Sequence, residues 1–414
     1  MATERVPASL SGATSYGHIL ELIQSTGGLS RQQLLSSTGM SRATLYERLD
    51  TLLKRGFVYE AESLHATGGR RSRKIRFDDR GRVILALILG QTHATVSVTG
   101  LDGRPLRSRT LAHEIRDPAD AVLAPLIRTG RDLLAENKAE SLTGIGVSLP
   151  SPVDPETGHV AHATTLPGWP IDAVTAAVSR EWTEPVVVEN DARAAALGER
   201  NTDEETLVYV KVASGIGCGT VVDGAILRGA HGAAGDIGHI RVATDGPVCS
   251  CGRRGCLATF SSGRALLDQL AGSGLTTLEA ISTAAKRDDS RVVAALDDAA
   301  DVLGQALAAT VATVNPARLV LGGTIGMLPS FVNRVRDRVL SDVVARIAEG
   351  LAIEAGAPGD EAAARGLATL VMRKAFSPIS VDSLITEHLG AASRRSADDD
   401  RSLSRAAAPA TTAQ

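Results

Sequence analysis

Two stretches share one pattern: VILALILGQTHATVSVT at residues 83–99 and LVYVKVASGIGCGTVV at residues 207–222. Each has an aliphatic and β-branched run, a turn containing glycine and a second such run, which is typical of a β-hairpin. Further buried strands are predicted at Ile145–Leu149 and Val186–Glu189, and helical segments alternate with them, which indicates an α/β fold. Because equivalent hairpins open two successive halves, we expect a duplicated, two-lobed architecture with a cleft between the lobes.

The bulk composition sets the size and class of the protein. A chain of 414 residues is too long for one core, so two or three domains are expected. Aromatic residues make up 3% and hydrophobic residues 43%, so the cores must be aliphatic. The strongest apolar run, Val83–Leu89, is far shorter than the ~20 residues that cross a bilayer, and Met1–Leu10 shows no secretory signal. We therefore expect a cytoplasmic protein without a membrane partner.

The first eighty residues have the layout of a winged helix-turn-helix. Ile19, Leu20 and Ile23 predict an amphipathic helix that ends at Gly27-Gly28. Ser30 with Gln33 is typical of a capping box that begins a second helix. Ser41 begins a third helix, with leucines at 45, 49, 52 and 53 on one face. Strands at 57–60 and 74–77 then predict a hairpin wing, and this order of elements places the third helix in a DNA major groove.

Charge supports a DNA partner. Residues 1–82 hold 13 Lys/Arg and 8 Asp/Glu, a net charge of +5, whereas the remaining 332 residues carry −8. A basic run alone could be a solvated face, but here it coincides with the helix layout and a Gly-rich basic wing. We predict operator DNA as the partner; the contacting residues would be Ser41, Arg42, Thr44, Tyr46 and Arg48 of the third helix and Gly69, Arg70 and Arg71 of the wing.

A metal site is indicated by the clustered cysteines. Cys249, Cys251 and Cys256 follow a C-x-C-x4-C spacing, and His239 lies ten residues before the first of them. Three thiolates and one imidazole can complete a tetrahedral zinc shell with no open position, so we expect one structural zinc per chain. The alternative is three buried thiols and a core histidine. The fourth cysteine, Cys218, lies in the Gly-rich turn and is expected to be a packing residue.

These segments together resemble the ROK family (repressors, open reading frames and sugar kinases). The resemblance rests on Glu189-Asn190-Asp191-Ala192-Arg193-Ala194-Ala195-Ala196-Leu197-Gly198-Glu199, Gly215-Ile216-Gly217-Cys218-Gly219, Gly235-Asp236-Ile237-Gly238-His239 and Cys249-Ser250-Cys251-Gly252-Arg253-Arg254-Gly255-Cys256. It implies an N-terminal winged helix-turn-helix followed by a two-lobed, actin-like fold of the sugar kinase and Hsp70 type. The expected division is 1–80 for DNA binding, 81–205 for the first lobe and 206–390 for the second lobe, which carries the zinc site. A C-terminal helix is expected to return to the first lobe, and 391–414 is expected to be a disordered tail.

The same resemblance implies a ligand cleft. Asp191 matches the general base of the family's kinases, and Asn190, Asp236 and His239 would line the same effector site. Gly215, Gly217 and Gly219 match a phosphate loop. From the residues alone, Asp191 could equally be only the N-cap of the following Ala-rich helix.

Catalysis is not expected, because the residues that would hold the nucleotide and the sugar are altered. The acid that organises the metal in the first phosphate loop is Ile88 here, and a loop glycine is Gln91. A sugar-binding glutamate is Ala258, another is shortened to Asp236, and an asparagine is Thr165. We therefore expect a non-catalytic regulator, a repressor that binds its operator as a homodimer or homotetramer, with a sugar or sugar-derived effector. The alternatives are an active sugar kinase with a DNA-binding appendage, and a regulator that responds to another ligand or to none.

Overall fold

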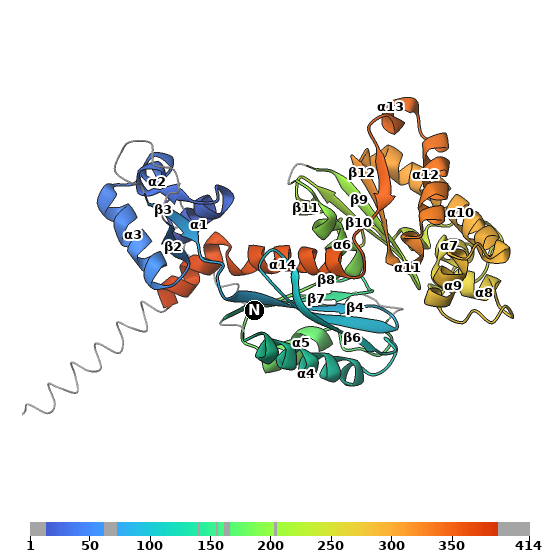
Figure 1. The fold of residues 1–414 in the computed structure, drawn as a ribbon, viewed down its shortest axis with the longest axis horizontal. Coiled ribbons are helices and arrows are strands. Elements are labelled where there is room, and N and C mark those ends of the chain that lie inside the picture. The colour runs from blue at the N-terminus through green and yellow to red at the C-terminus, as the bar shows by residue number, and fades with distance from the viewer. Residues whose placement is uncertain are drawn as a thin grey trace, which may run out of the picture. The chain divides into compact units, whose positions relative to one another are not determined.

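The computed structural model describes residues 14–61, 73–138, 141–154, 156–160, 166–202 and 205–387 (Figure 1). The chain divides into two units. The first unit joins Met1–Arg80 to Met372–Gln414, and the second unit is Gly81–Val371. Among the described helices, none combines the length and the apolar character needed to cross a membrane.

The first unit contains the predicted helices and hairpin. They are α1 (Tyr16–Ser25), β1 (Leu29–Ser30), α2 (Arg31–Thr38), α3 (Arg42–Lys54), β2 (Val58–Ala61) and β3 (Lys74–Phe77), with the strands in the order β1-β3-β2. Each helix starts at a serine cap: Ser15, Ser30 and Ser41 each accept a hydrogen bond from a first-turn backbone N–H. The capping box of Ser30 and Gln33 is present as expected.

The core of the first unit is completed by the C-terminal end of the chain. Phe376 packs edge-on against Phe57 and Phe77, with ring centroids 6.3 Å and 4.9 Å away. A helix over 378–387 follows, and the Asp382 carboxylate accepts a hydrogen bond from the Gly17 N–H at 3.1 Å. The sequence-based division placed residues 206–390 with the second lobe, apart from a C-terminal helix expected to return to the first lobe, whereas here the segment from Met372 onward groups with the first unit. The physical reason is that the apolar faces of α1, β2 and β3 need this segment to be covered.

The second unit contains two five-stranded mixed sheets. The first has the order β6-β5-β4-β7-β8, formed by β4 (Arg82–Leu89), β5 (His93–Thr99), β6 (Pro105–Ala112), β7 (Ser141–Leu149) and β8 (Val186–Asn190). The second has the order β11-β10-β9-β12-β13, formed by β9 (Leu207–Val212), β10 (Ile216–Val222), β11 (Ala225–Ile226), β12 (Arg318–Gly322) and β13 (Ala352–Ala355). Both predicted hairpins are confirmed, since β4 pairs antiparallel with β5 and β9 with β10.

Helices cover both sheets and also separate them (Figure 1). The helices α4 (Ala119–Asn137) and α5 (Ala173–Glu181) pack with the first sheet. The second sheet packs with α8 (Gly263–Gln269), α9 (Leu278–Ala285), α10 (Ser290–Val314) and α12 (Pro329–Asp342); α7 (Ala258–Ser261), α11 (Gly323–Gly326) and α13 (Ala345–Ala348) are single turns. Between the sheets lie α6 (Asp191–Glu199) and α14 (Glu361–Ala375), in one core with Ala86 and Ile88.

The central helices approach each other at backbone distance. A Cβ at Gly198 of α6 would lie 1.8 Å from the Ala362 carbonyl oxygen, and one at Gly366 of α14 would lie 1.8 Å from that of Ala194. Glycine is therefore required at both positions, because any side chain would push the helices apart. The first residue of α6, one of the two helices in this contact, is Asp191.

The C-terminal contribution to the first unit can be tested with Phe376→Ala. Removing a buried ring that packs on two others should destabilise the unit by about 3 kcal/mol, by loss of burial and formation of a cavity. Hydrogen exchange followed by mass spectrometry should then show roughly hundredfold faster exchange in α1 and α3, since 1.4 kcal/mol is tenfold. Ile379→Ala, at a side chain that is 57% exposed, is the control and should change little. Equal protection in the Phe376 variant and the control would refute the shared core.

Candidate functional site

The helix predicted to enter DNA, α3, presents a polar N-terminus. Ser41 caps it: its Oγ accepts from the Thr44 N–H at 3.1 Å and lies 2.8 Å from Thr44 Oγ1. Arg42 is exposed on the first turn. Tyr46 is 40% exposed, and the Arg31 guanidinium lies 4.7 Å from its ring centroid. Arg31 is thus a cation beside the predicted surface that the sequence alone did not indicate.

Among the other predicted DNA contacts, Arg48 is placed differently. Arg48 lies over the Tyr16 ring at 4.2 Å, so it packs on α1 of its own unit. Glu60 of the wing hairpin binds Arg31 at 2.6 Å and Arg73 at 3.1 Å, and these hydrogen bonds hold its pKa below the ordinary range. The predicted wing residues Gly69, Arg70 and Arg71 lie outside the described residues.

The second unit contains one large cleft, of about 1480 Å³, among the described residues. All the predicted effector residues line it: Asn190, Asp191, Asp236 and His239. Of the predicted phosphate-loop glycines, Gly215 and Gly217 also line it. Gly219 instead lies under α6, where a Cβ would approach the Ala192 carbonyl oxygen to 2.5 Å. Its role is therefore close packing.

The polar atoms of Asn190 are used within the fold. Its side chain is the N-cap of α6, with Oδ1 accepting from the N–H groups of Ala192 and Arg193 at 3.1 Å each. Its Nδ2 donates to the carbonyl oxygens of Leu149 and Ser151. The alternative in which Asp191 caps this helix is wrong, because the helix begins one residue earlier than expected and Asp191 is its first residue.

Asp191 lies in an ion pair that the sequence did not reveal. Its Oδ2 lies 2.8 Å from Nζ of Lys211, on β9 of the other sheet. Burial alone would lower the pKa of Lys211, but the nearby carboxylates of Asp191 and Asp360 outweigh it and raise that pKa above the ordinary value. The ammonium therefore remains charged at any physiological pH.

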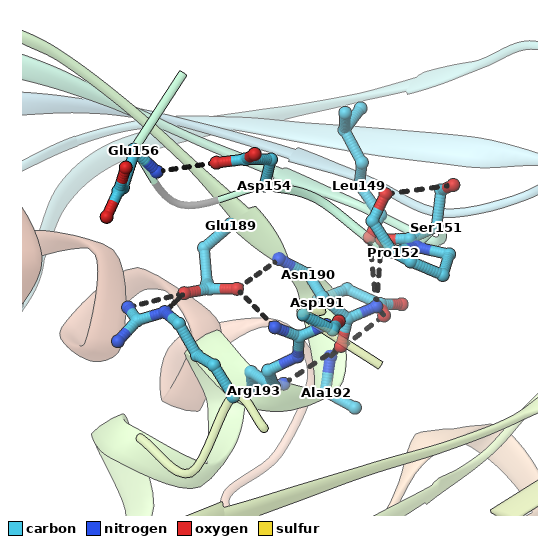
Figure 2. A network of polar contacts seen from close by, with 12 residues as sticks. Leu149, Ser151, Pro152, Asp154, Glu156, Glu189, Asn190, Asp191, Ala192 and Arg193 are labelled. Carbon is cyan, nitrogen blue, oxygen red and sulfur yellow. Dashed lines mark hydrogen bonds and ion pairs between the residues drawn. The ribbon is translucent and has the colours of Figure 1, made fainter. Parts of the chain in front are cut away.

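Buried charges form a network around Glu189 (Figure 2), and one member of it, Arg193, lines the cleft. The carboxylate is 1% exposed, and Arg228 binds its Oε2 at 2.7 Å and 3.2 Å through two nitrogens. Arg193, 3% exposed, lies 3.5 Å from Oε1 and also donates to the Gly232 carbonyl oxygen. Burial lowers the pKa of Arg193, the expected sign for a desolvated cation. The network ties the end of β8 to the loop after β11.

Ile88, where the resemblance expects a metal-organising acid in kinases, is a buried residue. Ile88 is 2% exposed and belongs to the core between the sheets. Gln91 lies in the turn between β4 and β5, and its Oε1 accepts a hydrogen bond at 3.1 Å from Arg264 of α8. A Cβ on Gly215 would lie 3.5 Å from Nε2 of Gln91, so this side chain lies beside the second Gly-rich turn.

The predicted metal ligands come together. One donor atom from each of His239, Cys249, Cys251 and Cys256 lies within 4.8 Å of all the others. Cys249 Sγ is 3.3 Å from His239 Nδ1, and Cys251 Sγ is 3.7 Å from Cys256 Sγ. Burial opposes ionisation of Cys251, but hydrogen bonds from Arg253 outweigh it and lower the pKa of this thiol to about 6. Since tetrahedral Zn–S bonds of about 2.3 Å place two sulfurs ~3.8 Å apart, the donor set fits a metal ion.

Comparison with known proteins agrees with this architecture. The family model "ROK family" matches residues 84–374, about two thirds of the chain. The chain belongs to the ROK family. A second model, "Winged helix-turn-helix DNA-binding", matches residues 17–59 of this ROK protein. The resemblance drawn from the sequence is confirmed.

Individual relatives include regulators and kinases. The xylose repressor of Bacillus subtilis is 26% identical over 362 residues, covering 86% of this chain and 94% of the repressor. A ROK family transcriptional regulator described as a homologue of E. coli MLC superposes with a TM-score of 0.75 at 24% identity, covering 90% and 99% of the two chains. A ROK glucokinase from Streptomyces griseus superposes with a TM-score of 0.60 at 24% identity, covering 70% and 98%.

The fold expectation is thereby confirmed: a winged helix-turn-helix and a two-lobed sugar-kinase-like ROK fold. With its DNA-binding domain and its relatives among repressors, this ROK protein is a DNA-binding transcriptional regulator.

The network around Glu189 gives a stability prediction. Glu189→Gln removes the charge that compensates two buried or half-buried guanidinium groups, so the second unit should lose about 3–5 kcal/mol. Both tryptophans, Trp169 and Trp182, lie in this unit, so urea unfolding followed by tryptophan fluorescence reports on it directly. Glu181→Gln breaks an exposed pair with Arg131 and should cost at most about 1 kcal/mol. Equal losses in the two variants would show that the buried network contributes no more than a surface pair.

Proposed function

We propose that this ROK protein is a repressor that binds an operator through its winged helix-turn-helix and senses a ligand in the cleft of its second unit. The observation that carries the proposal is the exposed, serine-capped N-terminus of α3 in a three-helix winged fold. Such an N-terminus offers backbone N–H groups and Arg42 to phosphate and base edges. The similarity to a protein named xylose repressor over 86% of the chain supports the repressor role.

The active form is proposed to be a homodimer or homotetramer. Winged helices that read symmetric operators bind two half-sites, and their separation is a geometric constraint. The oligomer would have two states that differ in the spacing of these domains. A ligand that binds one state more tightly than the other would change the affinity for the operator. The effector is proposed to be a sugar or sugar-derived compound, because the relatives include a xylose repressor and sugar kinases.

Phosphoryl transfer is not part of the proposed function. A kinase of this kind needs an acid to organise the metal ion, and position 88 is a buried isoleucine. It also needs a carboxylate free to accept a proton, and Asp191 is paired with Lys211. Gln91 places a side chain beside the Gly-rich turn where phosphates would need close backbone approach.

The metal is proposed to be structural zinc. His239, Cys249, Cys251 and Cys256 would hold it, and four protein ligands leave no position for substrate. When bound, zinc would cross-link the loop that carries Cys249 to the turn that carries His239. That loop borders the cleft, since Cys249, Cys251 and Arg253 line it.

DNA binding is tested with Arg42→Ala. Binding to a fluorescein-labelled mixed-sequence duplex of about 30 base pairs is measured by fluorescence anisotropy at a series of salt concentrations. Loss of one phosphate contact should weaken binding and reduce the slope of log K against log[salt] by about 0.9. Arg104→Ala is the control: it removes an equal charge from a side chain that is 85% exposed in the second unit. If the Arg42 variant had the same affinity and slope as the control, the assignment of α3 to DNA would fail.

The metal is tested by elemental analysis of protein purified without added chelator. We expect about one zinc per chain, lost in Cys251→Ser together with a lower melting temperature. Cys218→Ala removes the one cysteine outside the cluster and should retain the zinc. Zinc content that is unchanged by the Cys251 substitution would contradict the site.

A further inference from the structure

The Lys211–Asp191 pair joins two separate parts of the second unit. Asp191 follows β8, the edge strand of the first sheet, whereas Lys211 lies on β9 inside the second sheet. Both side chains line the cleft, and the exposed fractions are 21% for Lys211 and 9% for Asp191. An ion pair so placed lies where a ligand would contact the cleft wall.

Lys211 and two further donors together use most of the hydrogen-bonding capacity of the Asp191 carboxylate. Oδ1 of Asp191 accepts from the Ala192 N–H at 2.8 Å and from Asn190 Nδ2 at 3.2 Å, and Oδ2 binds Lys211. An ionised carboxylate has about four acceptor positions, so at most one, on Oδ2, is left for a ligand. The ammonium also offsets the negative charge, which weakens the charge assistance that makes hydroxyl-to-carboxylate hydrogen bonds strong.

Neutral sugars depend on such acceptors. A pentose or hexose presents a ring of hydroxyls, and each one that is buried must donate or accept a hydrogen bond to avoid a desolvation cost. Asn190 offers no substitute, because its Oδ1 already accepts two backbone N–H groups. At this point of the cleft, a hydroxyl donor finds at most one acceptor position on Asp191, and that position lies beside an ammonium.

We propose that Lys211 determines the ligand specificity of the cleft. Its ammonium is paired with the Asp191 carboxylate and so excludes neutral sugars that would bind a hydroxyl to that carboxylate. The inference rests on the proposed sensing role of the cleft, and it narrows the proposed effector to sugars or sugar-derived compounds that do not anchor a hydroxyl on Asp191. It does not rest on DNA binding. Removing the lysine side chain exposes the oxygen and restores its charge. The cleft then gains an acceptor for a hydroxyl.

The test is Lys211→Thr, a β-branched polar residue that suits the interior of β9. The full-length variant is titrated calorimetrically with D-xylose, D-glucose and N-acetylglucosamine. It should bind at least one of these sugars at least tenfold more tightly than the parent protein does, which is the gain expected of one charge-assisted hydrogen bond. Lys211→Arg keeps the ion pair and should bind like the parent. Lys286→Thr removes another lysine that lines the cleft and should also bind like the parent.

Folding is controlled in the same experiment by the double variant Lys211→Thr with Asp191→Asn, which removes both charges of the pair but keeps an oxygen at position 191. It should show a smaller gain of the same kind, and it replaces the single variant if that does not fold. No gain in the variant that folds overturns the proposal, because the pair is then only structural. Weaker sugar binding after loss of Lys211 also overturns it, because the lysine is then a sugar ligand. Mixed-sequence DNA binding, measured on the same samples, reports separately on the proposed repressor function.

Discussion

The close contact between α6 and α14 is the constraint on which the second unit depends. In this protein the two helices between the sheets approach at backbone distance, and Gly198 and Gly366 permit this by having no Cβ. Gly219 allows the same helix, α6, to rest on β10. Because α6 is packed on both sides, its first turn is held against β10, and Asn190 and Asp191 line the cleft. The cleft wall is thus determined by packing.

Buried charged side chains of the second unit are paired with opposite charges. Glu189 is balanced by Arg228 and Arg193, and Asp191 by Lys211. Buried pairs of this kind contribute little net stability, because desolvation offsets the attraction, but each partner strongly destabilises the fold when left alone. Their effect is to specify which side chains lie next to each other in the folded protein. In this protein they connect the end of the first sheet to β9 and to the loop after β11, so the geometry of the cleft and the position of the charges are coupled.

The core of the DNA-binding unit also depends on contacts between residues that are distant in the chain. It is built from two ends of the chain, with Phe376 set between Phe57 and Phe77 and Asp382 bound to the backbone of α1. A small helical domain has too little interior to be stable on a few aliphatic residues, and an added helix supplies the missing apolar surface. The three-helix pattern of the first sixty residues was sufficient to predict the fold class but not its complete core.

The sequence by itself determined the features that depend on local order. The serine caps, the two hairpins, the winged helix layout and the His239 and cysteine cluster follow from patterns a few residues long, and the structure has them where the spacing placed them. It also indicated the changed residues, Ile88 and Gln91, that argue against catalysis. Tertiary structure alone decided that Lys211 meets Asp191, that Gln91 meets Arg264, 173 residues away, and that the last helices close the first unit. The physical reason is that a single chain carries periodicity and capping as local signals, whereas an ion pair between sheets depends on how distant backbones pack, and no short pattern encodes that.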